Sequence, residues 1–327
     1  MGTRFFTSQK GFIGFLLLLL IGAAIAFRHS FMPRSSASST GEAFHREALR
    51  VAVLRGPSVV AVASWLENPP LVGERPLAMK VLDSPELLQA ALIKGEADVA
   101  MLPLISAANL YNKGVALQMI GCPIWGTLYM VERPTATRNT PLHLFGSGTT
   151  PDLLARHYLA QTRQAFPLNY NLRTAHEVAQ GLIANRVDRA VLGEPFLSMV
   201  LRKDSTLRIV ADLNRPTSSA DEMGFAQTAI VCTAKAMPHV AQLTEALRQS
   251  CTLTNAQPDS AIHWLEQHKV FAPEALDAES IARCRIQFRD AQASASAVEA
   301  FLHLIIAYEP RALGGRLPDA HFLAPAP

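Results

Sequence analysis

A loop of small and hydroxylated residues at 146–152 has the composition of a ligand-binding loop. It contains two glycines, one serine and two threonines, and Pro151 fits the first turn of a helix that Thr150 would cap. Backbone N–H and side-chain O–H donors at a helix N-terminus suit a ligand acceptor, although a well-capped helix without a ligand has the same sequence. No Gly-Lys-Ser/Thr follows, so this is not a nucleotide-binding P-loop. The candidate ligand-binding residues of this loop are Ser147, Gly148, Thr149 and Thr150.

A second candidate group follows the apolar stretch 51–54. Arg55 stands at the end of that stretch, and its guanidinium could hold a carboxylate, sulfonate or phosphate through a forked pair of hydrogen bonds. A solvated arginine at the end of a strand is the alternative. The candidate ligand-binding residues here are Arg55, Gly56, Pro57 and Ser58.

Three single residues also stand at expected loops or strand ends. Trp125 is flanked by Gly and Pro residues, so its indole could wall a pocket, and a core tryptophan is the alternative. Glu194 ends an apolar strand and could accept hydrogen bonds from a ligand N–H or a cation, or form a salt bridge between lobes. Gln227 begins a strand beside an expected hinge.

The sequence lacks the usual motifs of catalysis and of metal binding. It has no Gly-x-Ser-x-Gly, His-Glu-x-x-His or Cys-x-x-Cys, and its ten histidines are scattered without ligand spacing. We therefore expect no catalytic residue, no metal and no cofactor. Of the four cysteines, Cys251 and Cys284 are the preferred disulfide pair, and four buried thiols are the alternative.

An internal repeat with an offset of ninety residues shows which elements position these groups. Residues 92–102 match residues 182–192, with five identities. Gly95 and Asn185 occupy one equivalent position and are the residue types that best adopt the left-handed conformation ending a helix. Ser84 and Thr174 provide helix start signals, and short apolar strands are expected at 98–102 and 189–192. The repeat predicts two related α/β lobes with their loops at the carboxyl ends of the strands.

The chain is expected to cross between the lobes at 133–140 and to return at 226–232, where residues 227–231 indicate a strand. This gives a first lobe of residues 48–133 and 228–327 and a second lobe of residues 134–227. Helical segments are expected at 240–251, 258–268, 277–289 and 298–308.

The N-terminus has the pattern of an export signal. Arg4 and Lys10 precede an apolar stretch at 11–26 that ends Ala-Ile-Ala, too short to favour a spanning helix. Residues 1–26 are predicted to be a cleaved signal peptide, with an uncleaved anchor as the alternative, and the serine-rich residues 27–47 a flexible leader. The 327 residues carry a formal net charge of +3 without a basic run, so nucleic-acid binding has no support.

Together these motifs resemble a known family. The export signal, the run Gly-Glu-Ala-Asp-Val-Ala-Met-Leu-Pro at 95–103, the loop 148–152 and the Glu-Pro pair at 194–195 are similar to those of periplasmic solute-binding proteins of ABC transporters. The most similar cluster binds nitrate, sulfonate and taurine, or pyrimidine precursors of thiamine. The resemblance covers about residues 48–310 and implies the type II, two-lobe flytrap fold, each lobe a mostly parallel sheet flanked by helices. It adds Leu104 to the candidate ligand-binding residues.

The resemblance implies an exported, non-enzymatic protein that acts in the periplasm. It would bind a small polar solute, sulfonate-like or heterocyclic, between its lobes and deliver it to the permease subunits of an ABC importer. A monomer is expected. The alternative is an enzyme on the same fold, such as a lyase of menaquinone- or thiamine-precursor metabolism. In that case Glu194 would be the attractive titratable group in the cleft.

Overall fold

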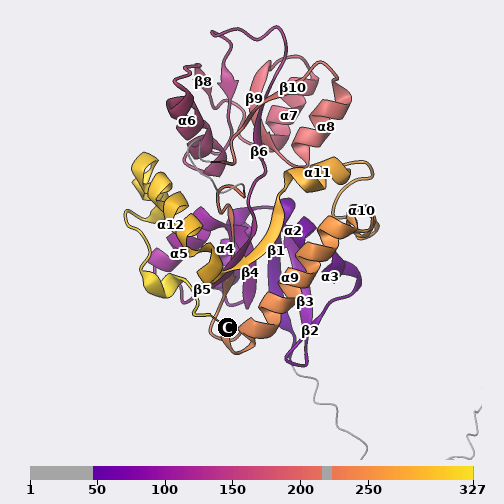
Figure 1. Ribbon diagram of the computed structural model, residues 1–327, viewed down its shortest axis with the longest axis vertical. Coiled ribbons are helices and arrows are strands. Elements are labelled where there is room, and N and C mark those ends of the chain that lie inside the picture. Colours follow the sequence, from indigo (N-terminus) through magenta and orange to yellow (C-terminus); the bar gives the residue numbers. More distant parts are fainter. Residues whose placement is uncertain (1–46, 216–222, 327) are drawn as a thin grey trace, which may run out of the picture. The chain divides into compact units, whose positions relative to one another are not determined.

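Two β-sheets organise the part of the chain that the structure describes (Figure 1). The structure is a computed structural model and describes residues 47–215 and 223–326, within one compact unit of residues 46–327. The predicted signal peptide and almost all of the predicted leader lie outside the described residues. None of the described helices is long and apolar enough to span a membrane.

The first sheet has seven strands in the described chain, in the order β12-β5-β11-β4-β1-β3-β2. The strands are β1 (Leu49–Leu54), β2 (Leu71–Val72), β3 (Arg75–Leu82), β4 (Val99–Pro103), β5 (Gln118–Ile124), β11 (Thr228–Cys232) and β12 (Ile286–Asp290). The second sheet has five described strands in the order β10-β6-β9-β7-β8. They are β6 (Leu128–Glu132), β7 (Leu142–His143), β8 (Leu168–Asn169), β9 (Arg189–Gly193) and β10 (Arg208–Asp212).

Helices cover these sheets. Those of the first half are α2 (Pro57–Ala61), α3 (Ser64–Glu67), α4 (Pro85–Ile93) and α5 (Leu104–Asn112). Those around the second sheet are α6 (Thr150–Thr162), α7 (Ala175–Ile183) and α8 (Phe196–Lys203). The C-terminal ones are α9 (Val240–Ala256), α10 (Pro258–Gln267), α11 (Ala278–Arg283) and α12 (Ala291–Tyr308), with short 3₁₀ turns at Met237–His239, Pro310–Leu313 and Ala320–Phe322.

The repeat detected in the sequence has matching local structure. Gly95 has φ of 66° and Asn185 has φ of 56°, so both end a helix in the left-handed region. The side chains of Ser84 and Thr174 accept hydrogen bonds from the N–H groups three residues on, as N-caps do. Strands β4 and β9 follow at equivalent positions. The two α/β halves therefore form from local signals that the sequence repeats.

The first crossing between the sheets lies earlier than the sequence indicated. We expected it at 133–140, but β6 pairs with β9 and β10 of the second sheet. Residues 128–133 therefore belong with the second sheet, and the chain crosses at 125–127. Pro134 and Pro141 lie in the loop between β6 and β7, so these prolines break a strand and do not separate lobes.

The sheets are mixed, where mostly parallel sheets were expected. β1 pairs in parallel with β3 and β4, but the returning strand β11 is antiparallel to its neighbours β4 and β5. The expected helix at 277–289 is also wrong in its second half, because α11 ends at Arg283 and β12 begins at Ile286. Ile286 and Phe288 alternate with more exposed residues, which is the strand period of two.

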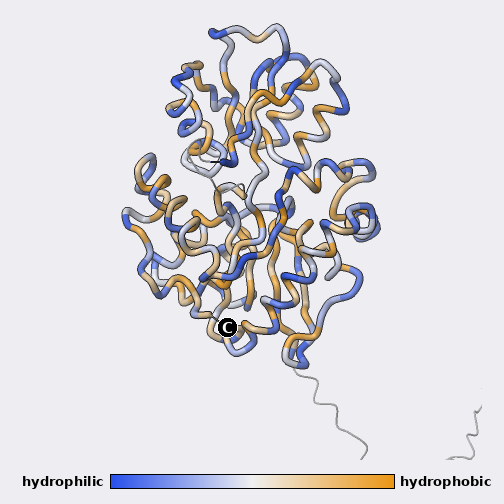
Figure 2. The backbone as a smooth tube through the Cα atoms, viewed as in Figure 1, coloured by the Kyte–Doolittle hydropathy of each residue, from blue (hydrophilic) through white to orange (hydrophobic). Residues whose placement is uncertain are grey.

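Both faces of the first sheet pack against helices. Along β1 and β4, Val51, Val53, Val99 and Met101 belong to one apolar cluster with α2 and α9, whereas Ala52, Ala100 and Leu102 belong to another with α5 and α12. Apolar residues on both sides of a strand are typical of a sheet covered twice. Figure 2 shows the hydrophobic residues concentrated along the strands.

A buried carboxylate fastens the first strand to the fourth. Asp98, 2% exposed, accepts hydrogen bonds from the backbone N–H of Arg50 at 2.9 Å and from its guanidinium at 3.0 and 2.7 Å. Lys235 lies 3.7 Å from the same carboxylate. Burial acts to raise the pKa of Asp98, but the hydrogen bonds from Arg50 outweigh it and hold the pKa below its ordinary value.

This arrangement predicts an acid-sensitive contribution to stability. Because its pKa is lowered in the folded state, Asp98 stabilises the fold above its unfolded pKa, and this is lost as the pH falls through the folded pKa. We expect Asp98→Asn to cost about 1–2 kcal/mol at neutral pH, since Arg50 remains partly solvated, and to flatten the stability profile at acid pH. Urea denaturation across pH measures both. The exposed neighbour Glu96→Gln is the control, and equal effects of the two variants would contradict the assignment.

Candidate functional site

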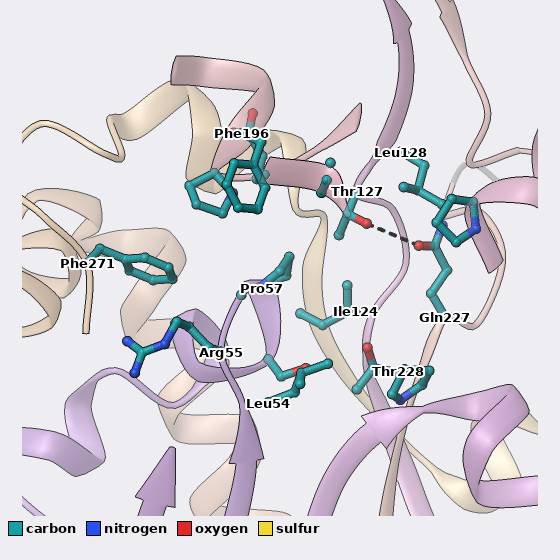
Figure 3. Close-up of a pocket in the computed structure, with 18 of the residues that line it drawn as sticks. Leu54, Arg55, Pro57, Ile124, Thr127, Leu128, Phe196, Gln227, Thr228 and Phe271 are labelled. Atoms are coloured by element: carbon teal, nitrogen blue, oxygen red, sulfur yellow. Dashed lines mark hydrogen bonds between the residues drawn. The ribbon is translucent and has the colours of Figure 1, made fainter. Parts of the chain in front are cut away.

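A cavity of about 500 Å³ is lined by residues of both sheets (Figure 3). Leu54, Pro103 and Ile124 come from the carboxyl ends of β1, β4 and β5, and Gly193 from that of β9. The starts of α2, α6, α7 and α8 reach the same space. In α/β sheets ligands bind at these strand ends, because loops and helix N-termini converge there. The cavity is therefore the candidate binding site.

Most of the cavity wall is apolar. Three phenylalanines take part: Phe145 follows β7, Phe196 begins α8 and Phe271 follows α10. The other apolar lining residues are Leu54, Pro57, Pro103, Ile124, Leu128, Pro151, Ala175, Pro195, Met199, Val270, Ala272 and Ala275. A wall of this composition with few polar groups is typical of a small-molecule site.

Arg55 lines the cavity but is already engaged. Its Nε–H donates to Asp83 Oδ1 at 2.5 Å, and its Nη1 donates to the carbonyl of Val270. In Figure 3 the guanidinium points away from Gln227 and Thr228 on the other side of the cavity. The residues Gly56, Pro57 and Ser58 that follow it also line the cavity. Arg55 thus ties β1 to the loop after β3 and to the segment after α10.

Three hydroxyl groups that line the cavity have no hydrogen-bond partner among the described residues. They belong to Ser58, Thr150 and Thr228, whose exposed fractions are 4%, 9% and 8%. The residues are largely buried, but their hydroxyl oxygens are not among the buried side-chain atoms that lack a partner, so each oxygen keeps some surface open to the cavity. These hydroxyls are therefore free to bond a ligand or water in the cavity.

Gln227 lines the cavity, but its amide is used within the protein. Its Oε1 accepts from the Thr127 hydroxyl at 3.2 Å, and its Nε2 donates to Asn214 Oδ1 at 2.9 Å. Asn214 Oδ1 also accepts from the N–H groups of Thr127 and Leu128, each at 2.8 Å. This cluster joins the two segments that run between the sheets. Gln227 therefore positions the cavity wall at the crossings.

Glu194 forms the salt bridge that the sequence left as an alternative to ligand binding. Its Oε1 accepts from Arg283 Nε at 2.5 Å, and its Oε2 accepts from the Ser198 N–H at 3.1 Å. Arg283 belongs to α11 and also bonds the Ser198 hydroxyl and Glu279. Burial raises the pKa of Glu194, and these hydrogen bonds oppose the rise. Although Glu194 lines the cavity, its oxygens hold α11 against the second sheet's α8.

The loop at 146–152 is built differently from the expectation. The helix begins at Thr150 with Thr149 as N-cap, whereas we expected Thr150 to be the cap. Asp152, 1% exposed, accepts the Gly148 N–H at 2.8 Å and the Tyr170 hydroxyl at 2.7 Å. The Asp152 carboxylate therefore accepts a backbone hydrogen bond of this loop that we expected a ligand to accept. Of the four candidates in this loop, Thr150 lines the cavity, whereas Ser147, Gly148 and Thr149 do not.

Two other candidates lie in the core instead of the cavity wall. Trp125 is 0% exposed, its indole N–H donates to the carbonyl of Gln287 at 2.7 Å, and Arg289 lies over its ring. Leu104 is also 0% exposed, and its neighbour Pro103 lines the cavity in its place. Trp125 begins the segment that crosses between the sheets, and β12 lies against it, so the flanking glycines and prolines mark a buried crossing.

The preferred disulfide is also wrong. All four cysteines lie in the described chain as buried free thiols, and the Cys284 Sγ donates to the carbonyl of Ser280 at 3.2 Å. Burial raises the pKa of Cys122 and of Cys251 to about 12, so both stay protonated at neutral pH. Among the described residues no group of three or more His, Cys, Asp and Glu side chains could hold a metal ion.

Sequence reasoning missed the aromatic residues and Thr228. Phe145 and Phe196 each follow a strand of the second half closely, so their position after the strand was an available signal. Phe271 lies in a loop that no motif marks, and only tertiary packing brings it to the cavity. Thr228 lies within the strand predicted at 227–231, but only its neighbour Gln227 was a ligand-binding candidate.

Several solved structures are similar to this one. The fold is that of two-lobe periplasmic binding proteins. A crystal structure of an ABC transporter from Parabacteroides distasonis is 53% identical, with a TM-score of 0.83, and covers 85% of this chain and 99% of its own. The chain belongs to the same family of ABC transporter proteins as that structure, and it has the fold of their periplasmic binding components.

More distant structures share the fold. The periplasmic aliphatic sulphonate binding protein SsuA from Escherichia coli is 16% identical with a TM-score of 0.64, covering 86% of this chain and 92% of its own. The periplasmic nitrate-binding protein NrtA from Synechocystis is 11% identical with a TM-score of 0.57, covering 82% of this chain and 84% of its own. No protein-family profile matches the chain, and no curated protein matches it.

The Glu194–Arg283 pair gives a prediction with a matched control on the same arginine. Glu194 has a 1% exposed side chain, so Glu194→Gln leaves Arg283 without its buried counter-charge and should destabilise the protein by about 3 kcal/mol. Glu279 bonds Arg283 from an 80% exposed position, so Glu279→Gln should cost less than about 0.5 kcal/mol. Urea denaturation compares the two, and similar losses would show that burial of the pair is unimportant.

Proposed function

We propose that this chain is the exported solute-binding component of an ABC importer. It binds a small solute in the cavity between its two sheets and delivers it to the permease subunits in the membrane. The observation that carries the proposal is one cavity lined by strand ends of both sheets, in a chain 53% identical to an ABC transporter structure. Sulfonate-like and heterocyclic solutes are the two classes that the family resemblance offers.

The construction of the cavity supports a protein that closes on its ligand. Two segments run between the sheets, near residues 125–127 and 223–227, and the C-terminal helix α11 bonds to the second sheet's Glu194. A ligand that contacts both sides stabilises the closed arrangement by its differential affinity for closed over open. The periplasm is the expected site of action, with the N-terminal segment 1–26 as the export signal.

The alternative enzyme hypothesis has less support in the cavity. Its one candidate for a titratable catalytic group was Glu194, and both oxygens of that carboxylate are bonded to protein groups. No other carboxylate, histidine or cysteine lines the cavity among the described residues apart from Asp83, which holds Arg55. A general acid or base needs access to substrate, so solute capture without turnover is the better proposal.

Ligand-induced closure tests the proposed function. A panel of sulfonates, nitrate, pyrimidines and amino acids is screened by thermal shift, and each hit is then examined by small-angle X-ray scattering. We expect at least one compound to raise the melting temperature and to reduce the radius of gyration. Mass spectrometry of the recovered compound should show it unchanged. Turnover of the compound would favour the enzyme, and stabilisation without closure for every hit would contradict the flytrap mechanism.

A further inference from the structure

We propose that the cavity takes an uncharged solute with a ring-sized apolar body and two or three hydrogen-bonding atoms, and that it rejects anions such as sulfonates, carboxylates and nitrate. The inference rests on the proposed function and specifies the ligand class of the same cavity. Its basis is the pairing of the charged side chains that line the cavity in the described chain, the aromatic surface, and three hydroxyls of largely buried residues that bond no other described residue.

Charge pairing leaves no cation for an anionic ligand. Arg55 is the one basic residue among the described residues that line the cavity, and it is held by Asp83 and by the Val270 carbonyl. The nearby Arg283 is bonded to Glu194 at 2.5 Å and to Glu279 at 2.7 Å. An anion would have to displace Asp83 from Arg55, and it would lie beside the Glu194 carboxylate, whose charge Arg283 already balances.

The positive end of the α6 helix dipole at the cavity also has a protein carboxylate beside it. An anion could otherwise use the N-terminus of α6, where Thr150 and Pro151 line the cavity. Asp152 lies in the first turn of that helix, is 1% exposed, accepts the Gly148 N–H and forms an ion pair with Arg156 at 3.1 Å, so an already balanced protein carboxylate lies at the positive end of the dipole. A ligand with its own negative charge would have to compete with this carboxylate for the helix end.

The apolar wall matches an uncharged ring. Phe196 and Phe271 lie on different elements around the cavity, and Phe145 adds a third aromatic side chain from the second sheet (Figure 3 labels the first two). Aliphatic groups of Leu54, Ile124 and Met199 cover much of the remaining surface. Burial of an apolar ligand against such a wall is favourable roughly in proportion to the area removed from water.

The three hydroxyls define where polar atoms of the solute should lie. Ser58 comes from the first sheet's α2, Thr228 from β11 and Thr150 from α6 beside the second sheet. A hydroxyl can both donate and accept, so each can pair with an uncharged amide, hydroxyl or ring nitrogen. Because the hydroxyls come from both sides, a bonded solute would bridge the two sheets.

Charge-matched pairs of compounds test the proposal on the full exported protein. The probes are benzamide with benzoate, naphthalene-2-carboxamide with naphthalene-2-carboxylate, and naphthalene-2-sulfonamide with naphthalene-2-sulfonate. Thermal shift and calorimetry measure binding at low and high salt. We expect the uncharged member of at least one pair to bind at least about tenfold more tightly than its anion, with an affinity that salt leaves unchanged.

A variant that lacks one of the three hydroxyls tests whether that hydroxyl binds the solute. Thr228→Val keeps the shape of the side chain and removes its hydroxyl, so it should weaken the best uncharged probe about three- to tenfold. The matched control is Thr244→Val, because Thr244 is also buried but its hydroxyl donates to the Ala241 carbonyl within α9, away from the cavity. The control should bind the probe with unchanged affinity.

The possible failures are separable. Tighter binding of the anionic members, or affinity that falls steeply with salt, would overturn the uncharged-solute proposal and leave solute binding itself standing. No stabilisation by any uncharged member would also overturn it, whatever the anions do. Equal losses of probe affinity in the Thr228 and Thr244 variants would show that the Thr228 hydroxyl does not bind the probe. The proposed function is judged separately, by whether any solute of the wider panel closes the protein.

Discussion

The hydrogen bonds of Asn214 are the constraint on which the geometry of the cavity depends. This side chain is 0% exposed and bonds the backbone of Thr127 in the first crossing, of Leu128 at the start of β6, and the amide of Gln227 in the second crossing. Its Nδ2 also donates to the Leu128 carbonyl at 3.0 Å. The segments between the sheets are thereby held together beside the cavity, which Thr127, Leu128 and Gln227 line. Buried amides of this kind are costly unless every atom is bonded, and here they are.

The charged groups around the cavity follow a second constraint, which is mutual neutralisation. Arg55 is fastened by Asp83, Glu194 by Arg283, and the start of α6 by Asp152. Each of these charged groups has a partner within the described chain. Thr228 differs from these paired groups, because its hydroxyl bonds no other described residue. The cavity is an apolar space with a few neutral polar contacts, because the charged side chains in its wall are paired within the protein: Arg55 with Asp83 in a partly exposed pair, and Glu194 with Arg283 in a buried one.

Prediction from the sequence succeeded where signals were local and failed where they were not. The repeat, the N-caps at Ser84 and Thr174, and the left-handed Gly95 and Asn185 depend on a few neighbouring residues, and all are present in the structure. The crossing at 125–127 was missed because the pairing of β6 with β9 joins residues about sixty positions apart. Trp125 was misjudged for the same reason, since β12 covers it from far along the chain.

The sequence by itself determined the two related α/β halves, the helix boundaries around the repeat and the family. These depend on periodicity, capping and composition, which act over a single turn or strand. Only the tertiary structure decided which candidates share the cavity: Arg55, Ser58, Thr150, Glu194 and Gln227 line it, and Trp125 does not. It also decided that Arg55 and Glu194 are already paired. The partners of a side chain depend on packing between segments that are distant in the sequence, so a local sequence pattern does not predict them.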